Sequence, residues 1–319
     1  ETYNNLGGAF KDIGQTDEAI KAYKKSILLN SNYAHPHNNM GNINKEQGKV
    51  DEAIDSYKKA LLINPDYADA HNNIGNLFKE QGKVDEAVDS FKKALLIKPD
   101  YSLAHKNLSF ALLNQGRLKE GLNEYEWRLK TDSFKTQLRY FSQPMWDGEK
   151  SLKGKTILIW CEQGIGDTIN WSSYLPLLNT QAKHCILECQ RKLVPLLQRS
   201  FPNVEVRPEN RRLDIERDDF DFHLPIGSLY KNLIKEISSI NKNEAYLIPN
   251  SERVNYWRKK LKSLGKGPYI GISWKSSNMS PERLPDFTKI LEWSPIFRIP
   301  DVTFINLQYA DSKNDLIQM

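Results

Sequence analysis

A repeat of 34 residues runs through the first 130 residues of the chain. Its period appears in three sets of equivalent positions: Leu6, Met40, Ile74 and Leu108; Gly14, Gly48, Gly82 and Gly116; Tyr23, Tyr57, Phe91 and Tyr125. A fixed period of this length is typical of solenoids of paired helices, in which each unit buries its apolar face by stacking on its neighbours. The repeat therefore predicts antiparallel helix pairs and no strand over residues 1–130.

Each repeat carries local signals for its two helices. We expect the first helix to end in a left-handed cap at Gly14, Gly48, Gly82 and Gly116. Small residues are expected where the paired helices cross, at Gly7, Gly41, Gly75, Ala19, Ala53 and Ala87. Pro65 and Pro99 end the second helix. The pattern resembles the tetratricopeptide repeat. The fourth copy departs from it, with Gly121 for alanine and Ser133 for proline, which suits a terminal repeat that docks on another element.

Asparagine recurs at one repeat position, at Asn5, Asn39, Asn73 and Asn107. If the first helix of each pair lines the concave side, stacking places these amides in a ladder. A primary amide donates and accepts hydrogen bonds, so it pairs with the backbone of an extended peptide of any sequence. The arrangement resembles the asparagine ladder of the O-GlcNAc transferase superhelix, which implies peptide binding. The alternative is that these are solvated consensus residues. His37, His71 and His105 recur too, and we expect groove or interhelix roles for them.

The character of the chain changes after residue 130. The segment 131–154 contains Pro144 and Gly148, so we expect a connector packed by Tyr140, Phe141 and Trp146. Apolar runs then alternate with helix-length segments, which predicts a parallel sheet with crossover helices. The expected strands are 156–161, 184–189, 204–207 and 222–226. A helix near 251–264 and strands at 269–274 and 302–309 read as the start of another α/β domain.

Composition excludes several classes of function. The net charge is +5, and basic residues are interleaved with acidic ones, which does not support nucleic-acid binding. No apolar run approaches the roughly 20 residues that cross a bilayer, so membrane insertion is not expected. Cys161, Cys185 and Cys189 lie in or beside apolar runs without a completing ligand set, so we expect buried free thiols, no metal, and a reducing, cytoplasmic compartment. Glu1 lies inside a repeat, which suggests a fragment or processed product.

The loop after the first expected strand is the candidate reactive site, because ligands of open parallel sheets bind at the carboxyl ends of strands. It contains Gly164, Gly166 and Asp167. The glycines allow close approach of a ligand, and Asp167 is a helix cap, a general base, or both. There is no phosphate-binding GxxxxGK[ST] motif. A dinucleotide fingerprint is incomplete, because Ile169 stands where the third glycine or alanine belongs.

The runs YEWRL, PMWDGE, EQGIGDTINWSSYLPLL and GISWKSSNMSPERLPDFTKILEW resemble tetratricopeptide-linked bacterial glycosyltransferases related to the ADP-heptosyltransferases. The resemblance implies a GT-B architecture of two Rossmann-like domains. It implies Asp167 as catalytic base, Gly164 and Gly166 in the acceptor loop, and no cofactor beyond a nucleotide-diphosphate sugar donor. Donor phosphates would be bound by Lys275, Ser276, Ser277 and Arg283. The D-T-x-x-x-H segment of that family is missing, so a complete donor site is not expected.

These features predict an α + α/β chain: a helical repeat array over 1–130, a connector over 131–154, an α/β domain over 155–265, and an incomplete second one over 266–319. The leading hypothesis is an inverting glycosyltransferase that transfers a sugar to a protein or peptide held by the array. The alternative is a non-catalytic tetratricopeptide adaptor that binds extended peptide segments. The sequence specifies neither the sugar, the nucleotide, the acceptor nor the oligomeric state.

Overall fold

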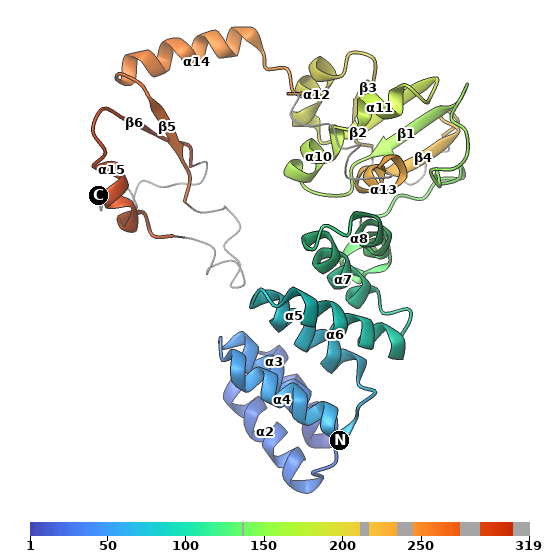
Figure 1. Ribbon diagram of the computed structural model, residues 1–319, viewed down its shortest axis with the longest axis vertical. Helices are drawn as coiled ribbons and strands as arrows, with labels where there is room; N and C mark the ends of the chain where they lie inside the picture. The colour runs from blue at the N-terminus through green and yellow to red at the C-terminus, as the bar shows by residue number, and fades with distance from the viewer. Residues whose placement is uncertain (136, 211–216, 235–244, 275–287, 309–319) are drawn as a thin grey trace. The chain divides into compact units, whose positions relative to one another are not determined.

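The structure is a computed structural model that describes residues 1–135, 137–210, 217–234, 245–274 and 288–308 (Figure 1). The chain divides into two compact units, Glu1–Tyr246 and Leu247–Met319. The first unit contains the repeat array together with a parallel sheet. The finer division of the chain at residues 130, 154 and 265 stays a prediction.

Four antiparallel helix pairs make up residues 1–125. They are α1 (Thr2–Asp12) with α2 (Thr16–Leu29), α3 (Ala34–Glu46) with α4 (Val50–Ile63), α5 (Ala68–Glu80) with α6 (Val84–Ile97), and α7 (Ser102–Asn114) with α8 (Leu118–Tyr125). Residues 1–130, all described, contain no strand, so the predicted helical solenoid is confirmed. The predicted left-handed caps are confirmed as well, with φ angles of 78°, 73°, 75° and 74° at Gly14, Gly48, Gly82 and Gly116.

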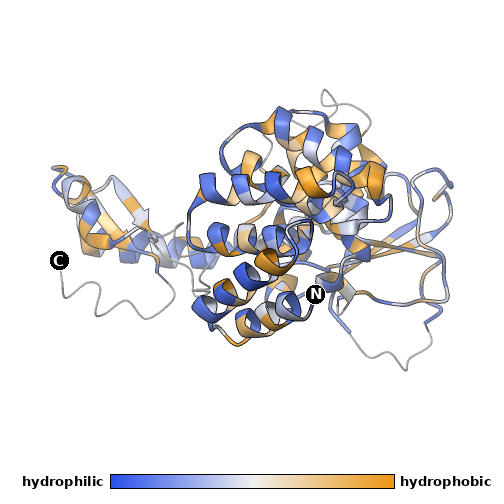
Figure 2. Cartoon of the chain, turned by 90° about the horizontal axis from the view of Figure 1, so that it is seen from below, coloured by the Kyte–Doolittle hydropathy of each residue, from blue (hydrophilic) through white to orange (hydrophobic). Residues whose placement is uncertain are grey.

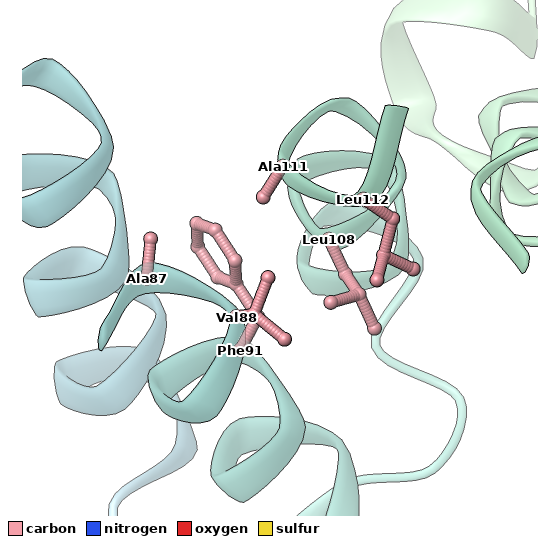
Figure 3. Close-up of a cluster of buried hydrophobic side chains, with 6 residues drawn as sticks. All are labelled: Ala87, Val88, Phe91, Leu108, Ala111 and Leu112. Atoms are coloured by element: carbon pink, nitrogen blue, oxygen red, sulfur yellow. The ribbon is translucent and has the colours of Figure 1, made fainter. Parts of the chain in front are cut away.

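Close helix crossing explains why glycine and an aromatic residue recur at the same spacing in the first three repeats. A Cβ atom on Gly7 would lie 2.5 Å from Cε1 of Tyr23, and one on Gly41 would lie 2.4 Å from Cε1 of Tyr57. Between repeats the contact is apolar: Figure 3 shows Ala87, Val88 and Phe91 of α6 facing Leu108, Ala111 and Leu112 of α7. Hydrophilic and hydrophobic residues alternate around the helices of the array (Figure 2), as expected for helices with one buried face.

The array bends toward its first helices. Successive first helices contact one another, α1 with α3, α3 with α5 and α5 with α7, and more extensively than successive second helices do. The second helix of each pair instead packs against the first helix of the next repeat. The first helices therefore line the concave face, which is where the asparagine column was expected.

A short 3-10 helix, η1 (Glu126–Lys130), and α9 (Asp132–Lys135) lead from the array into the connector. Trp146 is buried, and Phe141 packs edge-on against Phe220 with ring centroids 5.2 Å apart, as predicted. The prediction for Tyr140 was wrong, because its side chain is 76% exposed. An aromatic residue in a connector carries no sequence signal for the direction in which it points.

The sheet of the first unit contains four parallel strands in the order β3-β2-β1-β4. Their bounds are β1 (Thr156–Trp160), β2 (His184–Cys189), β3 (Glu205–Pro208) and β4 (Phe222–Pro225). The connecting helices are α10 (Ile165–Ser172), α11 (Leu175–Asn179), η2 (Arg191–Leu193), α12 (Val194–Ser200), η3 (Ile226–Ser228) and α13 (Leu229–Leu233). The central strand is buried on both faces, and residues 157–160 have no exposed surface. The predicted parallel sheet is confirmed.

The second unit begins with α14 (Ser251–Leu264), none of whose residues is buried. Two parallel strands follow, β5 (Tyr269–Ile272) and β6 (Thr303–Asn306), with η6 (Ile290–Trp293) and α15 (Ser294–Phe297) between them in sequence. Ile272, Trp274 and Ile290 form a small apolar cluster. The fold is thus a helical solenoid followed by small parallel sheets, and the GT-B architecture stays a prediction. Within the described residues, no helix is both long enough and apolar enough to cross a membrane.

Candidate functional site

Two columns of asparagines run along the concave face and join successive first helices. In each link, the Nδ2 atom of one repeat donates to an Oδ1 atom of the preceding repeat. The links are Asn39 to Asn4 at 3.0 Å, Asn73 to Asn38 at 3.0 Å, and Asn107 to Asn72 at 2.9 Å. The accepting residues are buried. A buried amide without a partner would cost about 1–3 kcal/mol, so these bonds hold the repeats in register.

The inter-repeat bonds determine which donor and acceptor atoms of the asparagine column remain available to a ligand. Asn73 also donates from Nδ2 to Oδ1 of Asn42 at 3.1 Å, so both of its amide hydrogens are committed. The Oδ1 atoms of Asn39, Asn73 and Asn107 accept no hydrogen bond from any described residue. Asn5 is exposed and receives only a 3.5 Å contact from Asn4. The column therefore presents carbonyl acceptors whose orientation is set by the fold.

Sequence reasoning missed the bonds between repeats. Their signal was the doublet of asparagines, Asn4-Asn5, Asn38-Asn39 and Asn72-Asn73, of which only the second member was considered. The structure shows that the first member is the buried acceptor. The expected column is present, and its role in peptide binding stays a prediction.

Ion pairs run beside the asparagines and obey the same spacing. Nζ of Lys11 lies 2.7 Å from Oε1 of Glu46, and Nζ of Lys45 lies 3.1 Å from Oε1 of Glu80. Each pair joins the last turns of two successive first helices. The equivalent lysine of the third repeat is Lys79, whose register partner is an asparagine of α7.

The repeated histidines secure the loops between repeats. Nε2 of His71 lies 2.9 Å from the carbonyl oxygen of Pro65, and Nε2 of His105 lies 2.8 Å from that of Pro99. His105 also stacks on Trp127 with ring centroids 3.8 Å apart. His105 thus has the expected interhelix contact, with η1, whereas the printed bond of His71 is to a loop.

The carboxyl ends of β1 and β4 form the other candidate site. Strand order reverses between these strands, and ligands of open parallel sheets bind where the order reverses. Here that position is filled by Arg128, which comes from η1 at the end of the array. Its Nη2 atom donates to Oε1 of Glu162 at 3.0 Å and to Oγ of Ser228 at 2.9 Å. The backbone N–H of Gly227 donates to the same Glu162 oxygen at 3.1 Å.

Arg128 and Glu162 form a buried ion pair at this junction between the array and the sheet. Burial raises the pKa of Glu162, and the nearby Arg128 opposes that rise. Arg128 makes a second ion pair, from Nη1 to Oε1 of Glu126 at 2.7 Å. Oε2 of Glu162 and Nε of Arg128 are buried and have no hydrogen-bond partner. The site therefore joins the array to the sheet by charges that water does not solvate.

Aromatic packing completes the junction. Tyr125 accepts a hydrogen bond on its hydroxyl from Nε2 of Gln163 at 2.6 Å, and its ring lies 4.4 Å from the guanidinium carbon of Arg128. The ring of Trp171 stacks on it at 5.8 Å. In the other repeats, the equivalent aromatic ring covers a glycine. Ser109 occupies that position in the fourth repeat, so Tyr125 does not pack over a glycine. It contacts the α/β part instead.

The reactive-loop residues lie at the start of α10. The N-cap residue of α10 is Gly164 rather than Asp167, which is the third residue of the helix. Oδ2 of Asp167 accepts a hydrogen bond from the backbone N–H of Gly164 at 3.2 Å, so the carboxylate caps the helix from within its first turn. A Cβ atom on Gly166 would meet nothing within 4 Å, which leaves the loop open. The expected donor-phosphate residues Lys275, Ser276, Ser277 and Arg283 lie outside the described residues. The catalytic, acceptor-loop and donor roles stay predictions.

The three cysteines lie near this edge of the sheet or within it. Cys161, Cys185 and Cys189 are all buried and free, as predicted. Burial raises the pKa of Cys185 and Cys189 to about 12, so their thiols stay protonated at neutral pH. They fill the core of the sheet.

Comparison with known families settles the nature of the array. Models of the TPR repeat match residues 7–48 and 41–82, and a tetratricopeptide-repeat model matches residues 68–101. Residues 7–101 are tetratricopeptide repeats. The tetratricopeptide array thus accounts for the period, the caps and the glycine–aromatic packing described above.

Other proteins are similar to part of this chain. Protein FlbA of Caulobacter vibrioides is 33% identical over 186 residues, which is 54% of this chain and 31% of FlbA. The chain thus spans about a third of the length of that relative. A crystal structure of MamA shares 27% identity at a TM-score of 0.37 and covers 43% of this chain and 80% of MamA.

A further solved structure, YrrB, is described as a TPR protein with an unusual peptide-binding site. It shares 21% identity at a TM-score of 0.36 and covers 41% of this chain and 68% of YrrB. PilF of Pseudomonas aeruginosa shares 22% at a TM-score of 0.39, covering 42% of this chain and 61% of PilF.

Proposed function

We propose that this chain is an adaptor whose tetratricopeptide array binds an extended segment of another protein on its concave face. The observation that carries the proposal is the column of Oδ1 atoms on Asn39, Asn73 and Asn107. An extended backbone presents N–H donors at regular intervals, and carbonyl acceptors bind them irrespective of the side chains. Because inter-repeat bonds already orient these amides, little side-chain entropy is lost when a segment binds.

The α/β part supports an anchoring role better than a catalytic one. At the carboxyl ends of β1 and β4, where a ligand would be expected, the guanidinium of Arg128 is hydrogen-bonded to Glu162. The carboxylate of Asp167 is engaged in capping α10. Sugar transfer with Asp167 as base, and with a nucleotide-sugar donor, remains the alternative proposal for a longer protein that includes a complete donor domain.

Selection of peptides by the full chain tests the adaptor function. A random library of phage-displayed 12-residue peptides, which carries no assumption about the partner, should yield peptides that bind reproducibly. Replacing Asn39 and Asn73 together by alanine should weaken the selected peptide at least several-fold, because net hydrogen bonds contribute about 0.5–1.5 kcal/mol each. Asn32→Ala is the control, since Asn32 is exposed in the loop before α3.

The double variant also loses three inter-repeat bonds, one from Asn39 and two from Asn73, so its folded fraction must be measured by circular dichroism at the binding temperature. Failure to select any peptide, or unchanged affinity in a folded double variant, would overturn the proposal. Transfer of sugar from a nucleotide sugar to a selected peptide would favour the glycosyltransferase alternative instead.

A further inference from the structure

The column of ion pairs on the concave face is interrupted at its third position. The first two pairs, Lys11 with Glu46 and Lys45 with Glu80, each join residues 35 apart in the sequence. The same offset from Lys79 leads to Asn114, the last residue of α7. Asparagine cannot supply the negative charge, so the third lysine of the column has no carboxylate in its register position.

The carboxylate near Lys79 is that of Glu80, which is already paired with Lys45, and the other charges acting on Lys79 are positive. Lys79 is partly buried, and its side chain forms no ion pair or hydrogen bond with any described residue. Burial lowers the pKa of Lys79, the charge of Glu80 opposes this shift, and the weaker effects of Lys45 and Lys106 lower the pKa further. Lys106 stands in the fourth repeat at the position that Asn4, Asn38 and Asn72 occupy in the others, and it is likewise unpaired in the described structure.

We propose that the segment bound by the array carries an aspartate or glutamate whose carboxylate lies against α5 and α7, with Lys79 and Lys106 as its counter-charges. The inference rests on the proposed function and names the chemistry of the bound segment. The incoming carboxylate takes the place that Glu46 and Glu80 take at the first two positions of the column. Two partly buried lysines without an ion-pair partner among the described residues favour an anion more than an exposed pair would, because less of their charge is screened by water.

Asn107 follows Lys106 on the same helix, and its side-chain Oδ1 atom is an acceptor for a backbone N–H of the bound segment. One ligand residue can therefore donate its N–H to the asparagine column while a neighbouring side chain reaches the lysines. This geometry predicts a preference for an acidic residue at one fixed position of the bound segment, with the remaining positions unrestricted.

A substitution that supplies the missing carboxylate from the protein itself tests the inference. Asn114 is exposed at the end of α7, so Asn114→Glu adds the missing carboxylate without entering the core. Peptides selected by the wild-type chain from the random 12-residue library should share an acidic position, and Asn114→Glu should bind such a peptide about ten-fold more weakly. The matching peptide with glutamine for glutamate should bind both proteins equally. Asn32→Glu, which adds the same charge away from the concave face, should behave as wild type.

The outcomes separate this inference from the proposed function. Peptides enriched without any acidic position would overturn the inference and leave the adaptor function standing. Failure to enrich peptides at all would overturn both. An acidic preference that survives unchanged in folded Asn114→Glu would place the carboxylate elsewhere on the array and would also overturn the assignment to Lys79 and Lys106.

Discussion

Arg128 and Glu162 form a buried ion pair in which Nη2 and Oε1 lie 3.0 Å apart and the side chains are 1% and 0% exposed. Arg128 follows the last helix of the array, and Glu162 follows the central strand of the sheet. The pair thus joins the tetratricopeptide array to the α/β part inside one compact unit. Arg128 lies at the ends of β1 and β4, where the strand order reverses and a ligand would be expected. A residue of the repeat array therefore occupies that position.

We expect Arg128→Met to destabilise the first unit by about 3–5 kcal/mol, because it leaves Glu162 buried without a counter-charge. Chemical denaturation followed by circular dichroism measures the change. Lys155→Met is the matched control, since Lys155 and Asp221 form an exposed pair whose loss should cost less than about 1 kcal/mol. A cost for Arg128→Met no greater than the control would contradict a buried link.

The cost of Arg128→Met should also depend on pH. Burial already raises the pKa of Glu162, and removal of Arg128 takes away the charge that opposes this rise. A carboxyl whose folded pKa is raised leaves stability intact below its unfolded pKa and removes it as pH rises through the folded value. Arg128→Met should therefore approach wild-type stability near pH 4 and diverge from it toward neutral pH. A gap between the two proteins that is independent of pH would contradict this origin.

Gly7→Ala and Gly8→Ala should have opposite effects although they are neighbours in α1. A Cβ atom at Gly7 would lie 2.5 Å from the ring of Tyr23, whereas at Gly8 the nearest atom is 4.0 Å away. Gly7→Ala should lower the free energy of unfolding by about 1–3 kcal/mol through overpacking. Gly8→Ala should raise it by up to about 1 kcal/mol, because alanine is the better helix former. Equal effects of the two changes in thermal or chemical melts would show that the helices do not cross at Gly7.

The local signals in the sequence were sufficient for most of the fold. The expected strand 184–189 coincides with β2, because it is a continuous apolar run. The expected helix 251–264 coincides with α14, because its sequence is periodic and begins at a capping residue. Positive φ at Gly48 and Gly82 followed from the repeat alone. The exposure of Tyr140 could not be predicted, because nothing local distinguishes a packed aromatic residue from an exposed one in a connector.

The candidate sites were less predictable because they depend on partners far apart in the sequence. The asparagine column followed from the repeat, but the choice of Asn38 as the partner of Asn73 depends on the offset between stacked helices. The pairing of Arg128 with Glu162 had no local signal at all. An arginine at the end of one domain and a glutamate in a loop of another look like solvated charges until the fold brings them together.

His223 should make the stability of the first unit fall in mild acid. Burial lowers its pKa to about 4, and Arg139 adds to the effect, while the Nδ1 atom accepts a hydrogen bond from Nε1 of Trp160 at 3.2 Å. A group with a lowered pKa binds its proton more readily when unfolded, so stability is lost as pH falls from the ordinary histidine value of about 6.5 toward 4. The loss should total about 3 kcal/mol.

Urea denaturation between pH 7 and pH 4 checks the role of His223. Compared with wild type, His223→Gln keeps an acceptor for Trp160 and removes the titration, so its stability should fall less over this range. Parallel pH profiles for the two proteins would assign the acid sensitivity to other groups.

Asp167 allows its two expected roles to be separated by one pair of substitutions. As a helix cap it accepts the N–H of Gly164, so Asp167→Ala should lower stability by about 1 kcal/mol, whereas Asp167→Asn keeps an acceptor and should cost less. If the longer protein transfers sugar with Asp167 as general base, Asp167→Asn should reduce turnover by about 10²–10⁴-fold. Turnover within a few-fold of wild type would leave Asp167 with the capping role alone.

The asparagine links join residues 35 apart, one more than the length of the repeat. Each link therefore depends only on two adjacent copies and is independent of the total number of copies. Duplication of one whole repeat in the gene would recreate the same links on both sides of the insertion and leave every existing contact in place. The asparagine column can thus grow or shrink in evolution by single repeats, and under the proposed function the length of the bound segment would change with it.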